Sequence, residues 1–224
     1  MSNKGEKLIK DLICNPSLFE RRGQGYELLQ ECFTGFPLEN LIPLLKSDDE
    51  DILKPIIVIL SELAFQAFDL LPYVVPLINC EDSFIRYYAL ECIFLNSSGV
   101  YIDEFIHVIN GISDQDESNR NLIMHLLSNA DRYQLEAGVK LVAKHKIANY
   151  KLHQEGLRKL LSSDNMDDSE IMQMLNSNEP LLQQYGVMIA KEVYKNNSKL
   201  IDYALTSKNE DVKTFSKWVI DLNN

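Results

Sequence analysis

Four consecutive acidic residues, Asp48 to Asp51, are the first group of side chains in this sequence that could do chemistry. Paired carboxylates can act as general acids and bases, but the chain has 33 acidic residues and no pair stands out. Acidic residues also suit the start of a helix, because Asp accepts hydrogen bonds from unpaired backbone N–H groups and complements the helix dipole. Since capping needs one or two acids rather than four, the run is open to both interpretations, a helix start and a binding surface.

The sequence lacks the spacings of the common catalytic and metal-binding motifs. The four histidines and four cysteines have no HxxxH, HExxH or CxxC spacing, and no GxGxxG, P-loop or GxSxG pattern occurs. We therefore expect no metal, no cofactor and no enzymatic activity. His125, in the apolar stretch NLIMHLLS, is interpreted as a helix-packing residue.

The charge of the chain favours a basic protein partner. Its 22 Lys and Arg residues stand against 33 Asp and Glu residues, which gives a formal net charge of −11. Residues 1–112 hold 8 basic and 17 acidic residues, a net charge of −9. Such a surface repels nucleic-acid phosphate and anionic lipid, so we expect neither as a partner. Residues 132–159 are an exception, with seven basic and two acidic residues.

The chain also lacks the sequence signals of secretion. Its first residues, MSNKGEKLIKDLIC, have no apolar core of a signal peptide, and no uncharged apolar run approaches the length of a membrane span. The four cysteines are few and unpatterned, which is typical of reduced thiols. We expect a cytoplasmic protein without a membrane segment.

Segments of the sequence recur at a regular interval that is typical of helical repeats. ENLIPLLKSDDEDI, residues 39–52, aligns without gaps on PYVVPLINCEDSFI, residues 72–85, and weaker copies follow near residues 174–182 and 204–212. Each copy combines a short helix, a polar turn and a longer helix. Ala89, Gly186 and Ser216 occupy one position of the longer helix, where a small side chain lets two helices approach closely. Units of this kind bury their apolar faces only by stacking on one another.

The stretch CEDSFIRYYALECI, residues 80–93, resembles bacterial HEAT-like repeats. The resemblance covers roughly residues 38–222, although the Arg typical of the repeat is recognised only at Arg86 and residues 131–163 match poorly. It implies an all-α fold, a right-handed superhelical α-solenoid of about six helix pairs, in which residues 1–224 form a single repeat domain.

The repeat register predicts which polar residues share a surface. Stacked turns would align their acidic residues along one edge, and residues separated by one repeat would stack in columns on an inner face. The candidate partner-binding residues are Glu39, Asp48, Asp49, Asp51, Tyr73, Glu81, Asp82, Asp103, Glu104 and His107. An equally open interpretation is that these residues cap helices and cover solvated helix faces.

Two functions are consistent with such a chain. The stretch GFPLENLIPLLKS, residues 35–47, followed by SELA, residues 61–64, is similar to bacterial immunity proteins of contact-dependent inhibition and polymorphic toxin systems. The resemblance implies a monomer that neutralises a basic toxin domain, such as a nuclease, in a one-to-one complex. The alternative is a scaffold or adaptor of a cytoplasmic protein complex. The DNA glycosylases built from HEAT-like repeats need a basic track, which the acidic amino half does not offer.

Overall fold

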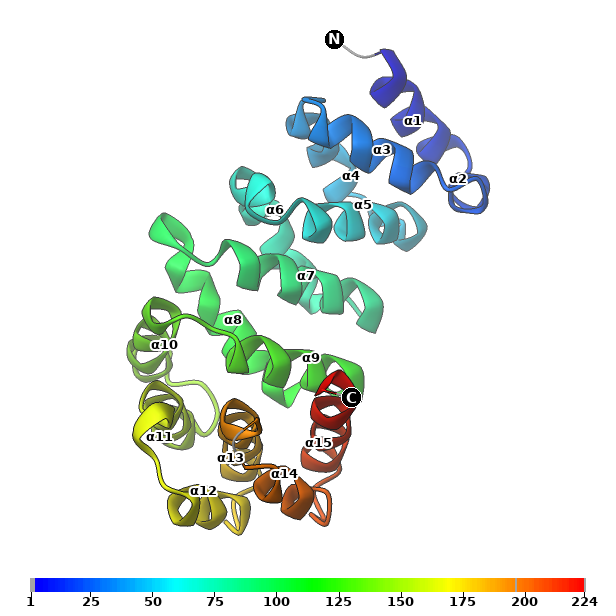
Figure 1. The fold of residues 1–224 in the computed structure, drawn as a ribbon. Coiled ribbons are helices and arrows are strands. Elements are labelled where there is room, and N and C mark those ends of the chain that lie inside the picture. The colour runs from blue at the N-terminus through cyan, green and yellow to red at the C-terminus, as the bar shows by residue number, and fades with distance from the viewer. Residues whose placement is uncertain (1–2, 196, 224) are drawn as a thin grey trace. The chain divides into compact units, whose positions relative to one another are not determined.

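Helical apolar periodicity in the sequence corresponds to helices in the computed structural model, which describes residues 3–195 and 197–223 (Figure 1). The described residues contain helices and no strand, and the chain is an all-α solenoid of helical repeats. The α-helices are α1 (Asn3–Cys14), α2 (Pro16–Arg21), α3 (Gln24–Phe33), α4 (Ile42–Leu45), α5 (Glu50–Leu63), α6 (Leu71–Val74), α7 (Ser83–Asn96), α8 (Phe105–Asn110), α9 (Glu117–Ser128), α10 (Arg132–His145), α11 (Tyr150–Leu161), α12 (Asp168–Leu175), α13 (Pro180–Val193), α14 (Lys199–Ala204) and α15 (Glu210–Asn223). Short 3₁₀ helices are η1 (Leu38–Leu41), η2 (Ala64–Leu70), η3 (Val75–Asn79), η4 (Gly99–Glu104), η5 (Gly111–Ser113) and η6 (Ser163–Asn165).

The chain forms two compact units, Met1–Ser97 and Ser98–Asn224, which we call the amino unit and the carboxy unit. In the amino unit the long helices α3, α5 and α7 pack in succession, and the short helices α4 and α6 pack against α5 and α7 (Figure 1). In the carboxy unit the pairs are α8 with α9, α10 with α11, α12 with α13, and α14 with α15.

The repeat predicted from the sequence sets where the long helices begin. Helices α5 and α7 begin at Glu50 and Ser83, which are equivalent positions in the two aligned segments of the sequence. Later long helices begin at a nearly constant interval, at Glu117, Tyr150, Pro180 and Glu210. Residues 131–163, which match the repeat poorly, nevertheless form the ordinary helix pair α10 and α11. The period thus survives where the sequence resemblance is weak, because it depends on apolar spacing rather than on particular residues.

A recurring turn opens these helices. The Asp49, Asp82 and Asp116 side chains each cap a long helix by accepting backbone N–H bonds, and Asn209 accepts the N–H of Asp211 in the same way. In three of the turns a Ser hydroxyl accepts the backbone N–H of the residue just before the helix. These hydroxyls belong to Ser47, Ser177 and Ser207. The acidic run at residues 48–51 therefore contains a helix cap, one of the two interpretations that its sequence allows.

An arginine at a fixed place in the repeat closes the same turn. The Arg86 guanidinium donates to the carbonyl oxygens of Cys80 and Glu81, at 2.9 and 2.7 Å. Arg120 donates to the carbonyls of Asp114 and Gln115 in the same way. The expectation that Arg86 alone holds this position is therefore wrong. Arg120 escapes the sequence pattern because a single extra residue lengthens the repeat that precedes it.

The small residues of the long helices lie where helices touch, as the sequence predicts. Ala89 and Ser216 are fully buried, and a Cβ on Gly186 would lie 3.0 Å from the Cβ of Met174 in α12. The burial of the aromatic residue before each small position differs between repeats. Tyr185 and Phe215 are buried, whereas Tyr88, at the equivalent position of its repeat, is only half-buried.

Residues 50–79 meet the length and composition of a membrane-spanning helix, although no membrane span is expected from the sequence. Half of the apolar window in this segment is buried inside the protein, as in the core helix of many proteins that do not span a membrane. The segment is also not one straight helix. Helix α5 ends at Leu63, the next residue Ala64 has a φ of 49°, and the chain continues through η2, α6 and η3 with Pro72 and Pro76. The buried apolar side chains of this segment belong to the repeat core.

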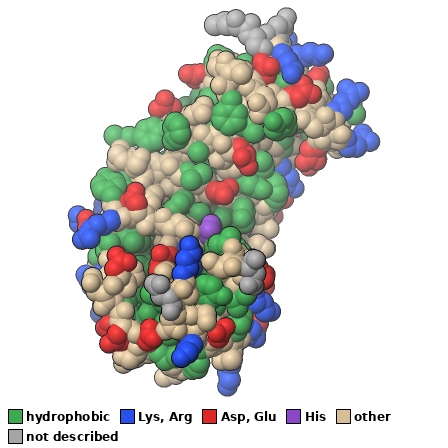
Figure 2. Space-filling view, viewed as in Figure 1, with side chains coloured by type: hydrophobic (Ala, Val, Ile, Leu, Met, Phe, Trp, Pro, Cys, Tyr) green, Lys and Arg blue, Asp and Glu red, His purple; other side chains and the backbone are tan. Residues whose placement is uncertain are grey.

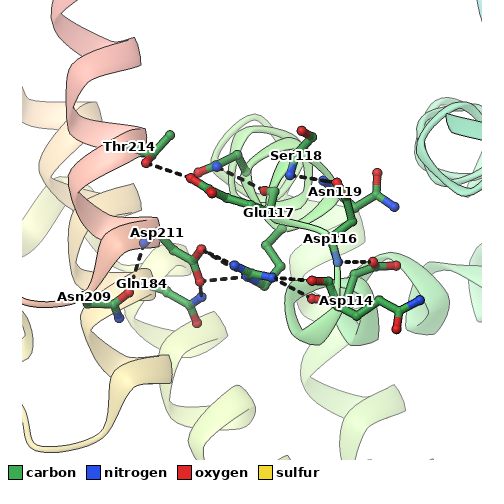
Figure 3. Close-up of polar contacts among 12 residues, drawn as sticks. Asp114, Asp116, Glu117, Ser118, Asn119, Gln184, Asn209, Asp211 and Thr214 are labelled. Atoms are coloured by element: carbon green, nitrogen blue, oxygen red, sulfur yellow. Dashed lines mark hydrogen bonds and ion pairs between the residues drawn. The ribbon is translucent and has the colours of Figure 1, made fainter. Parts of the chain in front are cut away.

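The carboxy unit adds contacts beyond those of a simple stack. Helix α9 packs against both α13 and α15, although several helices separate it from α15 along the chain. Figure 3 shows the polar contacts between them. The Arg120 guanidinium donates to both carboxylate oxygens of Asp211 at 2.9–3.0 Å, and the Gln184 amide donates to the same carboxylate at 2.9 Å. Thr214 donates to Glu117 at 3.0 Å. One largely buried carboxylate thus joins three helices of this unit.

We predict that Asp211→Asn destabilises the carboxy unit by about 1–3 kcal/mol, because it leaves the largely buried Arg120 guanidinium without its anionic acceptor. The neighbouring substitution Glu210→Gln is the control, since Glu210 is 70% exposed and pairs only with Lys213 at the surface. Urea unfolding, followed by the fluorescence of Trp218 in α15, measures both. Equal midpoints for the two variants would show that the Arg120 contact does not hold α15 in place.

We also predict that Gly156→Ala destabilises the protein by about 1–3 kcal/mol, because the added Cβ would overlap the ring of Tyr185, which is fully buried. Gly25→Ala is the matched control, because its Cβ would meet Phe19 at 3.8 Å, an ordinary contact, and Ala favours the helix. Thermal unfolding by circular dichroism distinguishes them. A Gly156→Ala protein as stable as the wild type would contradict this packing.

Candidate functional site

The acidic turn residues of the amino unit fall into two groups. Asp49 and Asp82 have structural roles as helix caps, and Asp82 also pairs with Lys54 of α5, whose Nζ lies 2.7 Å away. Asp48, Asp51 and Glu81 are exposed in the same turns. The Lys54–Asp82 pair brings the start of α5 to the turn before α7, so these two acidic turns are neighbours, as the register predicts.

The other predicted residues of the amino unit are Tyr73 and Glu39. Tyr73 in α6 is half-buried, and the Nζ atom of Lys46 lies 4.9 Å from the centre of its ring. This cation–π contact already occupies the face that was expected to anchor a partner. Glu39 in η1 is exposed.

The remaining predicted residues belong to the carboxy unit. Asp103 is exposed and pairs with Lys144 of α10, which holds the pKa of its carboxyl below the ordinary value. Glu104 lies 3.3 Å from His107, one turn further along the chain. These three residues form a local cluster of the carboxy unit, separate in the chain from the acidic turns.

A surface that is not expected from the sequence lies on the long helices of the amino unit. Figure 2 shows hydrophobic side chains gathered over α3, α5 and α7, with acidic side chains among them. Tyr26 and Phe84 are 68% and 43% exposed, and Tyr87 and Tyr88 are half-buried beside Phe84. None of these aromatic residues is among the binding residues predicted from the sequence. Their recurrence on successive long helices is a signal in the sequence, but it does not separate surface rings from core rings, because Tyr88 shares its repeat position with the buried Tyr185.

A groove runs along α5 on this surface, and we call it the α5 groove. It encloses about 470 Å³, within the range of small binding sites in proteins. Pro55, Val58 and Ile59 of α5 line its length, and Tyr26, Leu29 and Phe84 line its sides. Three charged residues also line it, namely Glu20, Lys54 and Glu62. The groove is therefore mainly apolar and aromatic, with carboxylates at its rim.

The groove lies in the most acidic part of the chain. Residues 23–97 hold three basic and twelve acidic residues, a net charge of −9. All three basic side chains are engaged within the protein. Lys46 covers Tyr73, Lys54 pairs with Asp82, and the buried Arg86 holds backbone carbonyls. The negative charge of this region is thus largely uncompensated by its own cations.

Two carboxylates at one end of the surface illustrate this excess. Glu91 of α7 is half-buried near Glu62 of α5, and neither has an ion-pair partner among the described residues. Burial raises the pKa of Glu91, a hydrogen bond from the Ser61 hydroxyl partly offsets this, and the nearby negative charge of Glu62 raises the pKa again. Burial and both carboxylates also raise the pKa of Tyr88. A cation brought to this place would relieve the repulsion between the two acids.

The carboxy unit presents a different surface. Helix α11 carries Lys151, Arg158 and Lys159 together with Glu155 on a shallow face, and among the described residues only Lys159 of these three cations forms an ion pair, with Glu170. His125 packs edge-on against Trp218 at 4.5 Å between ring centres, which agrees with its predicted packing role. The part of the chain that the structure describes contains no group of three or more His, Cys, Asp or Glu side chains arranged to hold a metal ion.

The arrangement of helices has a counterpart among solved structures. The chain aligns over 99% of its length with 98% of an engineered protein, a crystal structure from the Northeast Structural Genomics Consortium, at 14% identity and a TM-score of 0.54. A designed armadillo repeat protein aligns over 84% of this chain and 100% of its own, at 15% identity and a TM-score of 0.41. The first likeness supports the fold alone. No protein-family model and no curated protein sequence matches the chain.

We predict that Asp82→Ala costs about 1–2 kcal/mol of stability, because it removes a helix cap and the partner of Lys54. Glu81→Ala, one residue earlier and exposed, should change stability by less than about 0.5 kcal/mol. Lys54 holds the pKa of Asp82 below its ordinary value of 3.8.

This stabilisation by Asp82 is present above pH 3.8 and is lost as the pH falls through the lower pKa of the folded state. The difference between the wild type and Asp82→Ala should therefore be constant near neutral pH and shrink in acid. Urea unfolding across this pH range measures it. A difference that grows in acid would contradict the assigned ion pair.

Proposed function

We propose that this chain is a binding protein that forms a one-to-one complex with a basic protein through its amino unit. The observation that carries the proposal is the net charge of −9 in residues 23–97, where every Lys and Arg is engaged within the protein. A helical-repeat fold suits this role, because stacked helices present extended surfaces to other proteins. The exposed acids Glu39, Asp48, Asp51 and Glu81 add to the same field.

The electrostatics select the class of partner. An acidic surface speeds the encounter with a basic protein and disfavours nucleic acid, whose phosphates it repels. Exposed acids mainly tune the rate of association, while aromatic side chains in desolvated places contribute most of the affinity. Tyr26 and Phe84, exposed on the acidic unit, are the aromatic candidates for the second role.

The finer form of the proposal is that the partner is a toxin domain, most simply a nuclease, which the chain neutralises in the cytoplasm. Nucleases carry basic clefts because their substrates are polyanions, and an acidic protein surface competes for such a cleft. Support for this form comes from the charge of the amino unit, and its motivation is the resemblance of residues 35–47 and 61–64 to immunity proteins.

A scaffold or adaptor function is the second candidate. It is favoured by the basic face of α11, which has the opposite charge to the amino unit. Two surfaces of opposite sign would allow one chain to bind two different proteins. A neutralising protein needs only the first of them.

The proposal is tested first by cross-linking. A photo-reactive phenylalanine analogue replaces Tyr26 in the amino unit or, in a second protein, Tyr133 in the carboxy unit, since both side chains are more than half exposed. We expect Tyr26 to capture a basic protein, which is then purified and titrated by calorimetry at low and moderate salt. Capture of different proteins from the two positions would favour the adaptor function.

Charge reversal then identifies the surface. Glu39→Lys, Asp48→Lys and Glu81→Lys together should weaken binding by roughly tenfold and reduce its dependence on salt. The matched control, Lys151→Glu, Arg158→Glu and Lys159→Glu, should leave the affinity within about threefold. If only the control variant loses binding, the partner is acidic and the proposal is wrong. If the captured protein is a nuclease, an equimolar amount of the chain should abolish its cleavage of nucleic acid.

A further inference from the structure

The α5 groove differs chemically along its length. Its middle is apolar, formed by Pro55, Val58 and Ile59, while Glu62 lies at the carboxyl end of the same helix face. Glu91 of the next long helix lies close enough to Glu62 for the two charges to influence each other. An occupant that fits both parts has an apolar group and a cation a short distance apart.

Aromatic residues of α7 extend from the groove lining, at Phe84, toward the acidic end, at Tyr88. Phe84 and Tyr88 lie 4.7 Å apart, and Tyr87 and Tyr88 lie 5.2 Å apart, measured between ring centres. The charges of Glu91 and Glu62 both reach Tyr88. A Lys or Arg side chain at this place would meet two carboxylates and the faces or edges of aromatic rings, which attract cations.

The surroundings exclude the simplest internal cation. Lys54 lines the groove, but its Nζ atom pairs with Asp82 at 2.7 Å. Glu20 and Glu62 are the remaining charged side chains of the lining, and neither of them takes part in an ion pair with another described residue. A positively charged occupant would therefore complement these two carboxylates.

We propose that the α5 groove binds a segment of the basic partner in which an apolar side chain stands next to a Lys or Arg. The apolar side chain lies on Pro55 and Val58, and the cation lies at Glu62, on the side of the groove toward Glu91. This assignment rests on the proposed function, since it names the part of the partner that the amino unit recognises. Charge complementarity selects a basic segment over an anionic membrane, and the volume of about 470 Å³ has room for a few side chains.

A random library of dodecapeptides displayed on phage provides a defined probe. Selection on the wild-type chain should enrich peptides with Lys or Arg beside Leu, Ile, Phe, Met or Trp. The most enriched peptide is then synthesised with a fluorescent label and its dissociation constant is measured by polarisation. Glu62→Gln with Glu91→Gln should weaken it by roughly tenfold, and Val58→Arg should abolish binding. If the double variant does not fold, the single variant Glu62→Gln, at an exposed position, is measured in its place.

The matched control changes the same number of charges elsewhere on the amino unit. Glu6→Gln with Asp69→Asn removes two exposed carboxylates that lie outside both the groove lining and the predicted binding residues, and it should alter the dissociation constant by less than about threefold. An equal loss in the control and the groove variants would overturn the groove assignment and leave the proposed function standing. Enrichment of acidic peptides, or no enrichment, would overturn both. A chain that self-associates, and does so less after Val58→Arg, would show that a second copy occupies the groove.

Discussion

The repeats of this chain depend on how closely their helices approach one another. Small residues lie where the helices touch: Ala89 and Ser216 are fully buried there, and Gly186 faces the backbone of α12. Gly156 lies under the ring of Tyr185. A short helix and a long helix cannot bury their apolar faces alone, so each pair needs the next one. Small side chains at the contact let successive helix pairs stack closely without steric overlap. The regular spacing of the repeats then places the capping turns of α5 and α7 side by side.

That regular packing leaves each long helix with a second face that the repeat does not bury. In the amino unit this face carries Tyr26, Phe84 and Tyr88 together with Glu62 and Glu91. Apolar rings on a surface favour contact with another molecule, and carboxylates without ion-pair partners, exposed at Glu62 and half-buried at Glu91, favour a basic one. The carboxy unit uses its corresponding helices differently. There α9, α13 and α15 pack together, and Asp211 joins Arg120 and Gln184 where they meet.

Much of the fold could be predicted from the sequence because its signals are local. The apolar period, the Asp caps of α5 and α7 and the small residues of the long helices all depend on residues within one repeat. Contacts between distant residues could not be predicted in this way. The pairing of Arg120 with Asp211 joins helices that lie far apart along the chain. The equivalence of Arg120 to Arg86 is hidden in the sequence because the repeat between them is one residue longer.

The candidate site was harder to predict for the same reason. Charge counts pointed to the acidic amino half, residues 1–112, which the structure divides between the amino unit and the start of the carboxy unit. They did not reveal that Lys46 covers Tyr73 or that Lys54 neutralises Asp82, because both contacts bring together residues from different repeats. Nor does a sequence distinguish a buried aromatic ring, such as Tyr185, from the half-buried Tyr88 at the same repeat position. Exposure depends on which neighbour lies above each helix.

The central claim is that the open face of α3, α5 and α7 holds the partner. Hydrogen–deuterium exchange of the chain, alone and bound to the basic protein captured by cross-linking, tests it most directly. The account predicts slower exchange in residues 54–62 and 84–91 on binding, with residues 132–159 unchanged. Slower exchange confined to residues 132–159, with α3, α5 and α7 unaffected, would contradict it.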